Sequence, residues 1–447
     1  MKAGEPRHVF LISIDTLRAD HCGYLGYSKP TTPFLDELAE QGVAFTNHHS
    51  NSNNTLISHV SILTGLLPEA HGTYDGGNRR GRRRLTDGYE TIAERFARAG
   101  YTTAGFTTHP AWLGTTFGIQ QGFDHYESDW RGASDNTRLF LRWVDREQPA
   151  RLFAFLHYYD PHSESPSRGT LPYDSTHELI EQFAGAAPEG FTGHVRGRPD
   201  QTCTKFLFAL DRGEEPATPE IVTYMRGLYD AGVRKMDDDL RALFTGLRRR
   251  GLLEDALVVI TSDHGEEFHE HGGMLHGGWH EEVQRVPLVF WMPFLAEPRV
   301  DRLDAITRSI DVAPTILDLA GLTPIGQGRS SRAAMLGRET LADGAVVFGN
   351  SILRGRDEVS AYKYYGEDQP LAFYDMDGDP LETSNLIEDQ SWMAASSQRL
   401  SAIKSELDSI RATAREIANT VRASDVLGNV EMDPHQAEEL RRLGYVQ

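Results

Sequence analysis

Three polar clusters in the sequence contain residue types that could together bind a metal ion and attack an ester. The first follows an apolar run, residues 9–14, and begins with Asp15. The third follows another apolar run, residues 257–260, and contains the adjacent pair Asp263 and His264. A carboxylate together with a neutral imidazole is a ligand set for Zn²⁺ or Mn²⁺ rather than for Ca²⁺. Each Asp also has a simpler interpretation as a helix cap, and the residues alone leave both interpretations open.

The middle cluster, residues 54–65, places Thr55 at or just before the start of a predicted helix. Leu56, Val60 and Leu63 recur at helical spacing and predict one apolar face. A Thr at such a position commonly caps the helix through its hydroxyl. The same position offers unpaired backbone N–H groups and the positive end of the helix dipole, which suit an anion. From the residues alone, cap and nucleophile are equal interpretations of Thr55.

These clusters need a scaffold that brings them to one edge, and the rest of the chain predicts one. Apolar runs typical of buried strands alternate with amphipathic segments such as 233–247. The predicted strands are 9–14, 152–156, 257–260 and 287–291. This alternation predicts an α/β fold with a mostly parallel central sheet flanked by helices. Active sites of such sheets lie at the C-terminal ends of the strands, where the first and third clusters fall.

The chain is long enough for a large domain and a smaller unit. We expect a catalytic domain over residues 1–340 and a C-terminal α+β subdomain over 341–447. Residues 163–219 are rich in Gly, Pro, Ser and Thr and predict a long insertion between strands. The C-terminal pattern predicts a small antiparallel sheet, a helix and a tail, with strands at 345–348, 360–365 and 371–376 and the helix near 396–424.

Composition narrows the classes of function. The chain has 447 residues, of which 39% are hydrophobic and 25% charged, and its formal net charge is −20. These fractions are ordinary for a globular protein, and the negative charge disfavours a nucleic-acid partner. A basic stretch at residues 79–84 is either solvated or forms a positive rim for an anionic substrate. Apolar runs stay well short of the ~18–20 residues of a membrane span, so we expect no membrane partner.

The cysteines and the N-terminal residues point to a compartment. Cys22 and Cys203 lie far apart in the sequence, offer no disulfide framework, and favour a reducing environment. Residues 1–8 give way at once to a strand pattern, without the features of a secretory signal. We therefore expect a cytoplasmic protein that acts on a small-molecule anionic ester, either as a monomer or as a homo-oligomer.

Taken together, the three clusters resemble the sulfatase family of the alkaline phosphatase superfamily. The resemblance rests on Asp15 in its strand, on residues 55–65, and on Thr-Ser-Asp-His-Gly-Glu at 261–266. Further segments resemble family landmarks in the same order, at 100–103, 121–124, 157–162, 286–288, 311–315, 373–376 and 443–446. The resemblance covers nearly the whole chain and implies an alkaline-phosphatase-like core. It also favours the interpretation of Thr55 as a nucleophile.

The resemblance implies a metal ion and two catalytic histidines. One divalent ion is expected, with Mn²⁺ or Zn²⁺ favoured and Ca²⁺ or Mg²⁺ also compatible. Its implied ligands are Asp15, Thr55, Asp263 and His264. His162 resembles the family residue that meets the ester oxygen, and His276 resembles the residue on the leaving side. Both are therefore candidate catalytic residues.

Several further positions have weaker counterparts in the family. Substrate contacts are expected from His59, Asn78 and His109. Asp160 either binds a second metal ion with His162 and His276 or orders its own loop. His269 and His271 have no matching role, and surface positions are expected for them.

The departures from the family pattern bear on the substrate. Sulfatases oxidise a motif Cys, less often a Ser, to formylglycine, whereas this chain has Thr55, which that maturation does not convert. Ile57 and His59 stand where the motif has Pro and Arg. A Thr alkoxide can attack phosphorus, and water can then hydrolyse the phospho-enzyme, whereas a sulfo-threonine lacks the collapse that expels sulfate. We therefore predict a hydrolase of phosphodiesters, phosphonate monoesters or phosphomonoesters. The alternatives are a sulfatase acting without formylglycine, a phosphotransferase, and a catalytically silent binding protein.

Overall fold

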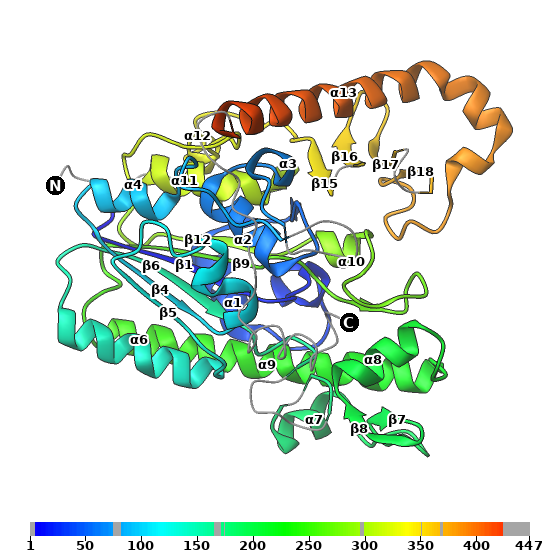
Figure 1. Ribbon diagram of the computed structural model, residues 1–447, viewed down its shortest axis with the longest axis horizontal. Coiled ribbons are helices and arrows are strands. Elements are labelled where there is room, and N and C mark those ends of the chain that lie inside the picture. The colour runs from blue at the N-terminus through cyan, green and yellow to red at the C-terminus, as the bar shows by residue number, and fades with distance from the viewer. Residues whose placement is uncertain are drawn as a thin grey trace.

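The computed structural model describes residues 5–74, 82–164, 171–173, 175–295, 299–349, 351–366 and 370–422. An eight-stranded sheet forms its centre, with helices on both faces (Figure 1). Its strands are β1 (His8–Ile14), β2 (Val43–Phe45), β4 (Thr102–Thr107), β5 (His125–Ser128), β6 (Leu152–Tyr158), β9 (Ala256–Thr261), β12 (Leu288–Trp291) and β13 (Arg302–Leu303). Their order is β13-β2-β12-β9-β1-β6-β4-β5. β12 runs antiparallel to β9 and β2, and the other pairs are parallel, so the sheet is mostly parallel, as predicted.

The register of the central strands brings their C-terminal ends to one place. All seven residues of β1 are buried, as expected for a strand covered on both faces. Ser13 of β1 pairs with His157 of β6 on one side and with Thr261 of β9 on the other. The residues that directly follow β1 and β9 therefore leave the sheet side by side.

Two hydrophobic cores lie on opposite faces of the sheet because successive strand residues point to opposite sides. Val9 and Leu11 belong to one core, and Phe10 and Ile12 to the other. The first core is covered by α2 (Thr55–Thr64), α4 (Ile92–Arg98) and α11 (Val312–Leu319). The second core is covered by α1 (Pro33–Gln41), α6 (Ala133–Glu147) and α9 (Pro219–Arg248). Figure 1 shows α6 and α9 below the sheet and α4 and α11 above it.

The expected insertion at 163–219 contains more regular structure than its sequence indicated. It includes α7 (His177–Phe183), α8 (Thr204–Asp211) and the antiparallel pair β7 (His194–Val195) and β8 (Arg198–Thr202). These elements gather beside α9 in Figure 1. Helices of seven and eight residues span about two turns each, which is too short for a clear helical period in the sequence.

The C-terminal part forms a four-stranded antiparallel sheet below a long helix (Figure 1). Its elements are β15 (Val346–Phe348), β16 (Ile352–Arg356), β17 (Ala361–Tyr365), β18 (Ala372–Asp375) and α13 (Gln390–Arg422). β16 was not predicted, because Arg354, Gly355 and Arg356 interrupt its apolar pattern. Leu353 and Phe373 join the same core as α2, so this sheet packs on the main one. The expected landmark at 443–446 lies outside the described residues.

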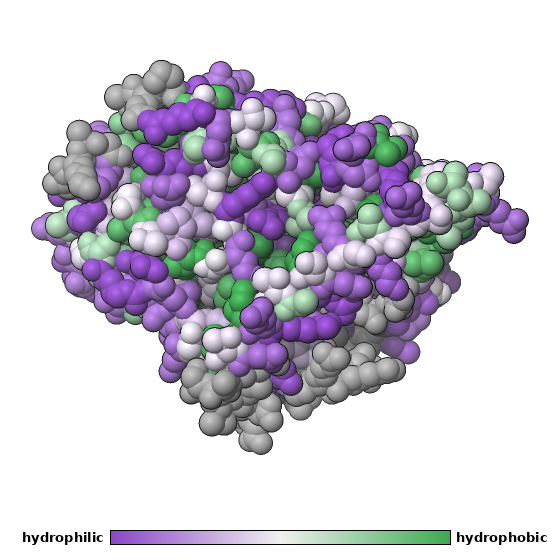
Figure 2. Space-filling model, turned by 90° about the horizontal axis from the view of Figure 1, so that it is seen from above, coloured by the Kyte–Doolittle hydropathy of each residue, from purple (hydrophilic) through white to green (hydrophobic). Residues whose placement is uncertain are grey.

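The remaining α-helices and strands of the described residues are short. They are α3 (Pro68–His71), α5 (Pro110–Leu113), α10 (Glu281–Gln284), α12 (Arg332–Met335), β3 (His48–His49), β10 (Glu267–Phe268), β11 (Met274–Leu275) and β14 (Thr307–Arg308). The face seen from above is mainly hydrophilic, with hydrophobic residues in small separate groups (Figure 2). Within the described ranges, no helix is long and apolar enough to cross a membrane.

Candidate active site

Asp15, Asp263 and His264 lie together where β1 and β9 end. One ligand atom from each lies within 4.8 Å of the others, and all three residues are buried. Adjacent Asp263 and His264 both reach this point because β9 ends at Thr261, so the strand alternation no longer holds there. Gly265 then passes so close to the carbonyl of Glu282 that a Cβ would overlap it. The structure thus brings together three of the four residues that the sequence proposed as metal ligands, and the fourth is Thr55.

The donor set of this cluster fits a divalent cation. Asp15 Oδ1 and Asp263 Oδ2 are buried and have no hydrogen-bond partner among the described residues. His264 Nδ1 donates to the Gly265 carbonyl at 3.1 Å, which leaves the Nε2 lone pair 3.3 Å from Asp263 Oδ2. Burial and the Asp263 carboxylate raise the pKa of Asp15 well above its usual value. Two crowded, buried carboxylate oxygens and one imidazole lone pair are ligands that a cation would satisfy.

Thr55 is the first residue of α2, and its hydroxyl lies 3.5 Å from His264 Nε2. The cap of α2 is the preceding residue, Asn54, whose Oδ1 accepts the Ile57 N–H at 3.2 Å. The capping role that the sequence left open for Thr55 therefore belongs to Asn54. The Thr55 side chain remains beside the ligand cluster, at the positive end of the helix dipole.

His59 lies one turn further along α2 and supports Thr55 from within the protein. Its Nδ1 donates to the Thr55 carbonyl at 2.6 Å, and its Nε2 accepts from the Ser13 hydroxyl at 2.9 Å. Burial lowers the pKa of His59 to about 4, so the ring is neutral near pH 7. Both ring nitrogens are engaged and the residue is fully buried. This placement orders the start of α2 and differs from the substrate contact that we predicted.

His157 is a site residue to which the sequence assigned no role. Its Nε2 lies 3.2 Å from Asp15 Oδ2, and its Nδ1 lies 3.3 Å from the Thr108 hydroxyl. Burial lowers the pKa of His157 to about 4, so the neutral ring can donate its Nε2–H to Asp15. The contact arises from the pairing of β6 with β1. That neighbour relation is not visible in the sequence, although His157 belongs to a recognised landmark.

His162 and His276 lie beside the ligand cluster and beside each other. Their ring centroids are 5.4 Å apart, and the His276 ring is 4.5 Å from that of His264. His276 Nδ1 lies 3.3 Å from Oε2 of Glu266, which is fully buried. Glu266 Oε1 accepts the hydroxyl of Tyr173 at 2.7 Å. The sequence assigned no role to Glu266 or Tyr173, and Tyr173 reaches the site from the insertion.

The surroundings of His162 fix which of its nitrogens carries the proton. Its Nδ1 accepts the backbone N–H of Glu164 at 3.3 Å, so a neutral ring bears its proton on Nε2. The ring stacks on Tyr159 with centroids 4.2 Å apart. Burial and the neighbouring His276 lower the pKa of His162 well below its usual value. His162 is therefore a neutral hydrogen-bond donor near pH 7.

His109 belongs to a buried aromatic group rather than to the ligand cluster. It caps α5 by accepting the Trp112 N–H at 3.4 Å. Its ring packs against Trp130 and Tyr159, each with centroids 4.6 Å away. Tyr159 also stacks on His162. His109 is therefore linked to the site through the Tyr159 ring.

Asp160 contacts a lysine in this structure. Its Oδ1 accepts from Lys235 Nζ at 2.7 Å, and its Oδ2 accepts the Ala133 N–H at 2.8 Å. Both carboxylate oxygens are thus engaged within the protein. This favours the interpretation that Asp160 orders its loop over the interpretation that it binds a second metal ion. Asn78, a predicted substrate contact, lies outside the described residues, as do residues 79–81 of the basic stretch at 79–84.

Comparison with known proteins agrees with this geometry. The sulfatase family model matches residues 7–322. The multifunctional alkaline phosphatase superfamily protein PehA of Trinickia caryophylli is 25% identical, over 87% of this chain and 92% of its own length. An arylsulfatase of Clostridium perfringens is 23% identical, over 86% of this chain and 91% of its own length. The phosphonate monoester hydrolase of Agrobacterium radiobacter has the same fold, with a TM-score of 0.69 at 22% identity, and the match covers 92% of this chain and 96% of that chain.

Proposed function

The chain belongs to the sulfatase family of the alkaline phosphatase superfamily, and we propose that it hydrolyses phosphate esters through a covalent intermediate on Thr55. The observation that carries the proposal is the place of the Thr55 hydroxyl, 3.5 Å from His264 Nε2, while Asn54 caps the helix. Enzymes of this superfamily bind a divalent metal ion, and Asp15 and Asp263 supply buried carboxylate oxygens for one.

The metal ion and the start of α2 would act on the same anionic substrate. An ion held by Asp15, Thr55, Asp263 and His264 would lower the pKa of the Thr55 hydroxyl and stabilise charge on the non-bridging oxygens; its imidazole ligand favours Mn²⁺ or Zn²⁺. The unpaired N–H groups in the first turn of α2 add a site for the same oxygens. His59 holds the carbonyl of Thr55 and thereby fixes the direction of this first turn.

The reaction would proceed in two displacements. Thr55 Oγ, after losing its proton to solvent, forms a bond to phosphorus while the bond between phosphorus and the alcohol oxygen breaks. The leaving oxygen receives a proton from His276. In the second displacement, water attacks phosphorus, the Thr55 Oγ–P bond breaks, and the neutral His276 takes up the proton of that water. Thr55 Oγ takes a proton back from solvent, and the enzyme returns to its starting state after releasing the alcohol and the phosphate or phosphonate.

We assign different roles to His276 and His162 beside the leaving oxygen. Glu266 accepts from His276 Nδ1 at 3.3 Å, so it orients the ring. The other nitrogen, Nε2, then carries the proton to be transferred. His162 is held neutral with its proton on Nε2, which suits a hydrogen bond to an ester oxygen. We assign proton transfer to His276 for this reason.

A panel of esters that share one aryl alcohol tests the substrate class. We expect kcat/KM for an aryl phosphodiester or phosphonate to exceed that for the matching aryl sulfate at least about tenfold, or ~1.4 kcal/mol. The reason is that phospho-threonine can be hydrolysed by water, whereas sulfo-threonine has no collapse route. A sulfate ester turned over faster than each phosphorus ester would overturn the phosphate assignment and leave the fold untouched.

A sulfatase that acts with an unmodified Thr55 is the second candidate. It is favoured by the relative from Clostridium perfringens, which is named an arylsulfatase and spans 86% of this chain. The same panel separates the two candidates, because the second predicts a preference for the sulfate ester without any modification of Thr55. The mass of the peptide that contains Thr55 checks the latter point.

A further inference from the structure

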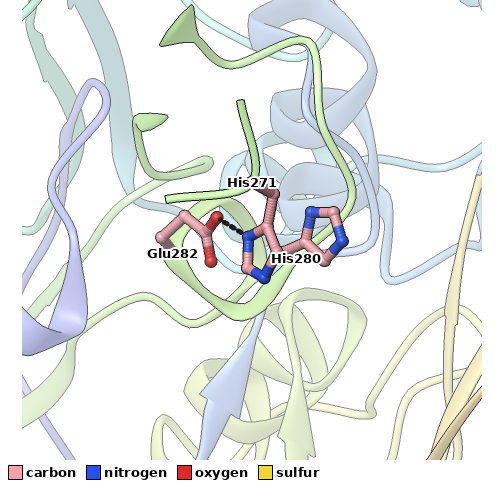
Figure 3. Close-up of side chains that lie close together, drawn as sticks. All are labelled: His271, His280 and Glu282. Carbon is pink, nitrogen blue, oxygen red and sulfur yellow. Dashed lines mark hydrogen bonds and ion pairs between the residues drawn. The ribbon is translucent and has the colours of Figure 1, made fainter. Parts of the chain in front are cut away.

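A second group of metal-ligating side chains lies outside the catalytic site, on the segment that carries His276. His271, His280 and Glu282 each offer one ligand atom, and these atoms lie within 4.8 Å of one another. We call these three residues the junction cluster. His271 comes from the turn between β10 and β11, whereas His280 directly precedes α10 and Glu282 lies in its first turn. Figure 3 shows the three side chains close together, with the Glu282 carboxylate directed at the His271 ring.

His271 was expected at the surface, but its side chain is only 18% exposed and is held at both nitrogens. Its Nδ1 lies 2.7 Å from Glu282 Oε1, and its Nε2 lies 3.0 Å from the Leu381 carbonyl. A carbonyl can only accept, so Nε2 carries a proton and Nδ1 is the nitrogen that can bind an ion. Metal-binding histidines are commonly oriented in this way, with the second N–H on a carbonyl.

Glu282 Oε1 faces His271 Nδ1 in this structure. A cation bound at Nδ1 would take the place of a proton there and would contact the same carboxylate.

His280 supplies a second nitrogen, which has no other use in the described structure. Its Nδ1 is buried and lacks a hydrogen-bond partner among the described residues. This unpartnered nitrogen can offer a lone pair to an ion. It stacks on His271, with centroids 3.5 Å apart and planes 11° from parallel.

We propose that His271, His280 and Glu282 form a second metal site whose ligands suit Zn²⁺. Two imidazoles and one carboxylate are a common zinc donor set, with a fourth position left for water. Because the stacked rings are nearly parallel, binding requires one of them to turn so that both Nδ1 lone pairs point at the ion. This rotation replaces the buried, unpartnered nitrogen of His280 with a bond to the metal.

The position of the junction cluster indicates what the ion would hold. His276 lies between His271 and His280 in the sequence, so both ends of its segment would be tied to one ion. The Leu381 carbonyl that orients His271 belongs to the C-terminal part of the chain. Bound zinc would therefore fasten the segment with the proposed proton donor against the C-terminal sheet.

Counting zinc in the full-length protein tests this proposal. Wild type, His280→Gln and the control His269→Asn are incubated with excess ZnCl₂, passed through gel filtration and analysed by mass spectrometry of the metal. His269 is an exposed histidine of the same segment with φ of 65°, a backbone conformation that Asn tolerates. We expect wild type and His269→Asn to retain one more zinc per chain than His280→Gln. Equal zinc content in wild type and His280→Gln would overturn the proposal.

A second measurement separates loss of the site from misfolding and from the catalytic ion. In an Asp263→Asn background, which weakens the catalytic centre, Co²⁺ should still produce a visible absorption band of a four-coordinate site. Adding His280→Gln should remove this band while leaving the melting temperature in chelator unchanged. A band that persists, or that never appears in Asp263→Asn, would contradict the junction site.

Discussion

The ligand cluster of Asp15, Asp263 and His264 and the junction cluster combine the same ligand types on different kinds of support. Asp15, Asp263 and His264 follow strands whose register is fixed by neighbours, and all are fully buried. His271 and His280 instead come from a turn and from the start of a four-residue helix, and both are partly exposed.

In both clusters a backbone carbonyl fixes the histidine: Gly265 for His264 and Leu381 for His271. In both clusters a few local contacts orient the ligands, whereas the strands, turns or helices that carry the ligands set how rigid each cluster is. We expect the reaction to take place at the rigid cluster of Asp15, Asp263 and His264. We expect the junction cluster to stabilise the segment that carries His276.

Replacing Thr55 should give the largest difference in kcat/KM between a change beside the ligand cluster and a change in the junction cluster. Thr55→Ala is expected to lower kcat/KM by about 10³-fold or more, because no other side chain supplies the nucleophile. Thr55→Ser should retain part of the activity, since its hydroxyl can make the same attack. His271→Gln, which alters the junction cluster, should change kcat/KM by less than about tenfold, because His271 touches no reacting atom. Thr55→Ala with a rate near that of wild type would erase this contrast.

His276 lies beside the ligand cluster, on the segment that also carries His271 and His280. The loss of kcat when it is replaced should depend on the leaving group of the ester. His276→Gln is expected to lower kcat by about 10²–10⁴-fold for an alkyl ester, whose leaving oxygen needs a proton. For an aryl ester with an acidic alcohol, the loss should be much smaller, since the leaving oxygen carries its charge readily. Matched assays of both esters, with His269→Asn as the control, measure the difference. Equal losses for both esters would show that His276 does not protonate the leaving oxygen.

The smallest effect concerns the start of α2, which carries Thr55 beside the rigid cluster. Asn54→Ala should lower the free energy of unfolding by about 1 kcal/mol, because it removes the acceptor of the Ile57 N–H. Thr91→Ala removes a comparable cap from α4, away from the ligand cluster, and serves as the control. Urea unfolding should show similar losses for both variants, but only Asn54→Ala should also reduce kcat. A stability loss for Thr55→Ala larger than that for Asn54→Ala would return the capping role to Thr55.

The ligand cluster could be located from the sequence because its residues follow recognisable apolar strands. Asp15 comes directly after one such run, and Asp263 and His264 come shortly after another, at the sheet edge where parallel strands end. The resemblance then favoured a nucleophile over a cap at Thr55. The structure places the cap one residue earlier, at Asn54.

Other contacts could not be predicted because they depend on which elements become neighbours. His157 reaches Asp15 only through the pairing of β6 with β1. Tyr173 reaches Glu266 from an insertion whose path the sequence does not define. The junction cluster lacks an apolar period or a familiar spacing, so His271 was expected at the surface. Side chains brought together by turns and packing leave little trace in the local pattern.

The most direct test of the central claim is the mass of the Thr55 peptide during turnover. Wild-type protein is mixed with an aryl phosphonate or phosphodiester, quenched in acid within a turnover, digested and analysed by tandem mass spectrometry. We predict a peptide whose added mass equals the transferred phosphoryl or phosphonyl group, with fragments that locate it on Thr55, and no such peptide in Thr55→Ala. An unmodified Thr55 peptide at every time point, together with a Thr55→Ala variant that turns over near the wild-type rate, would contradict the account.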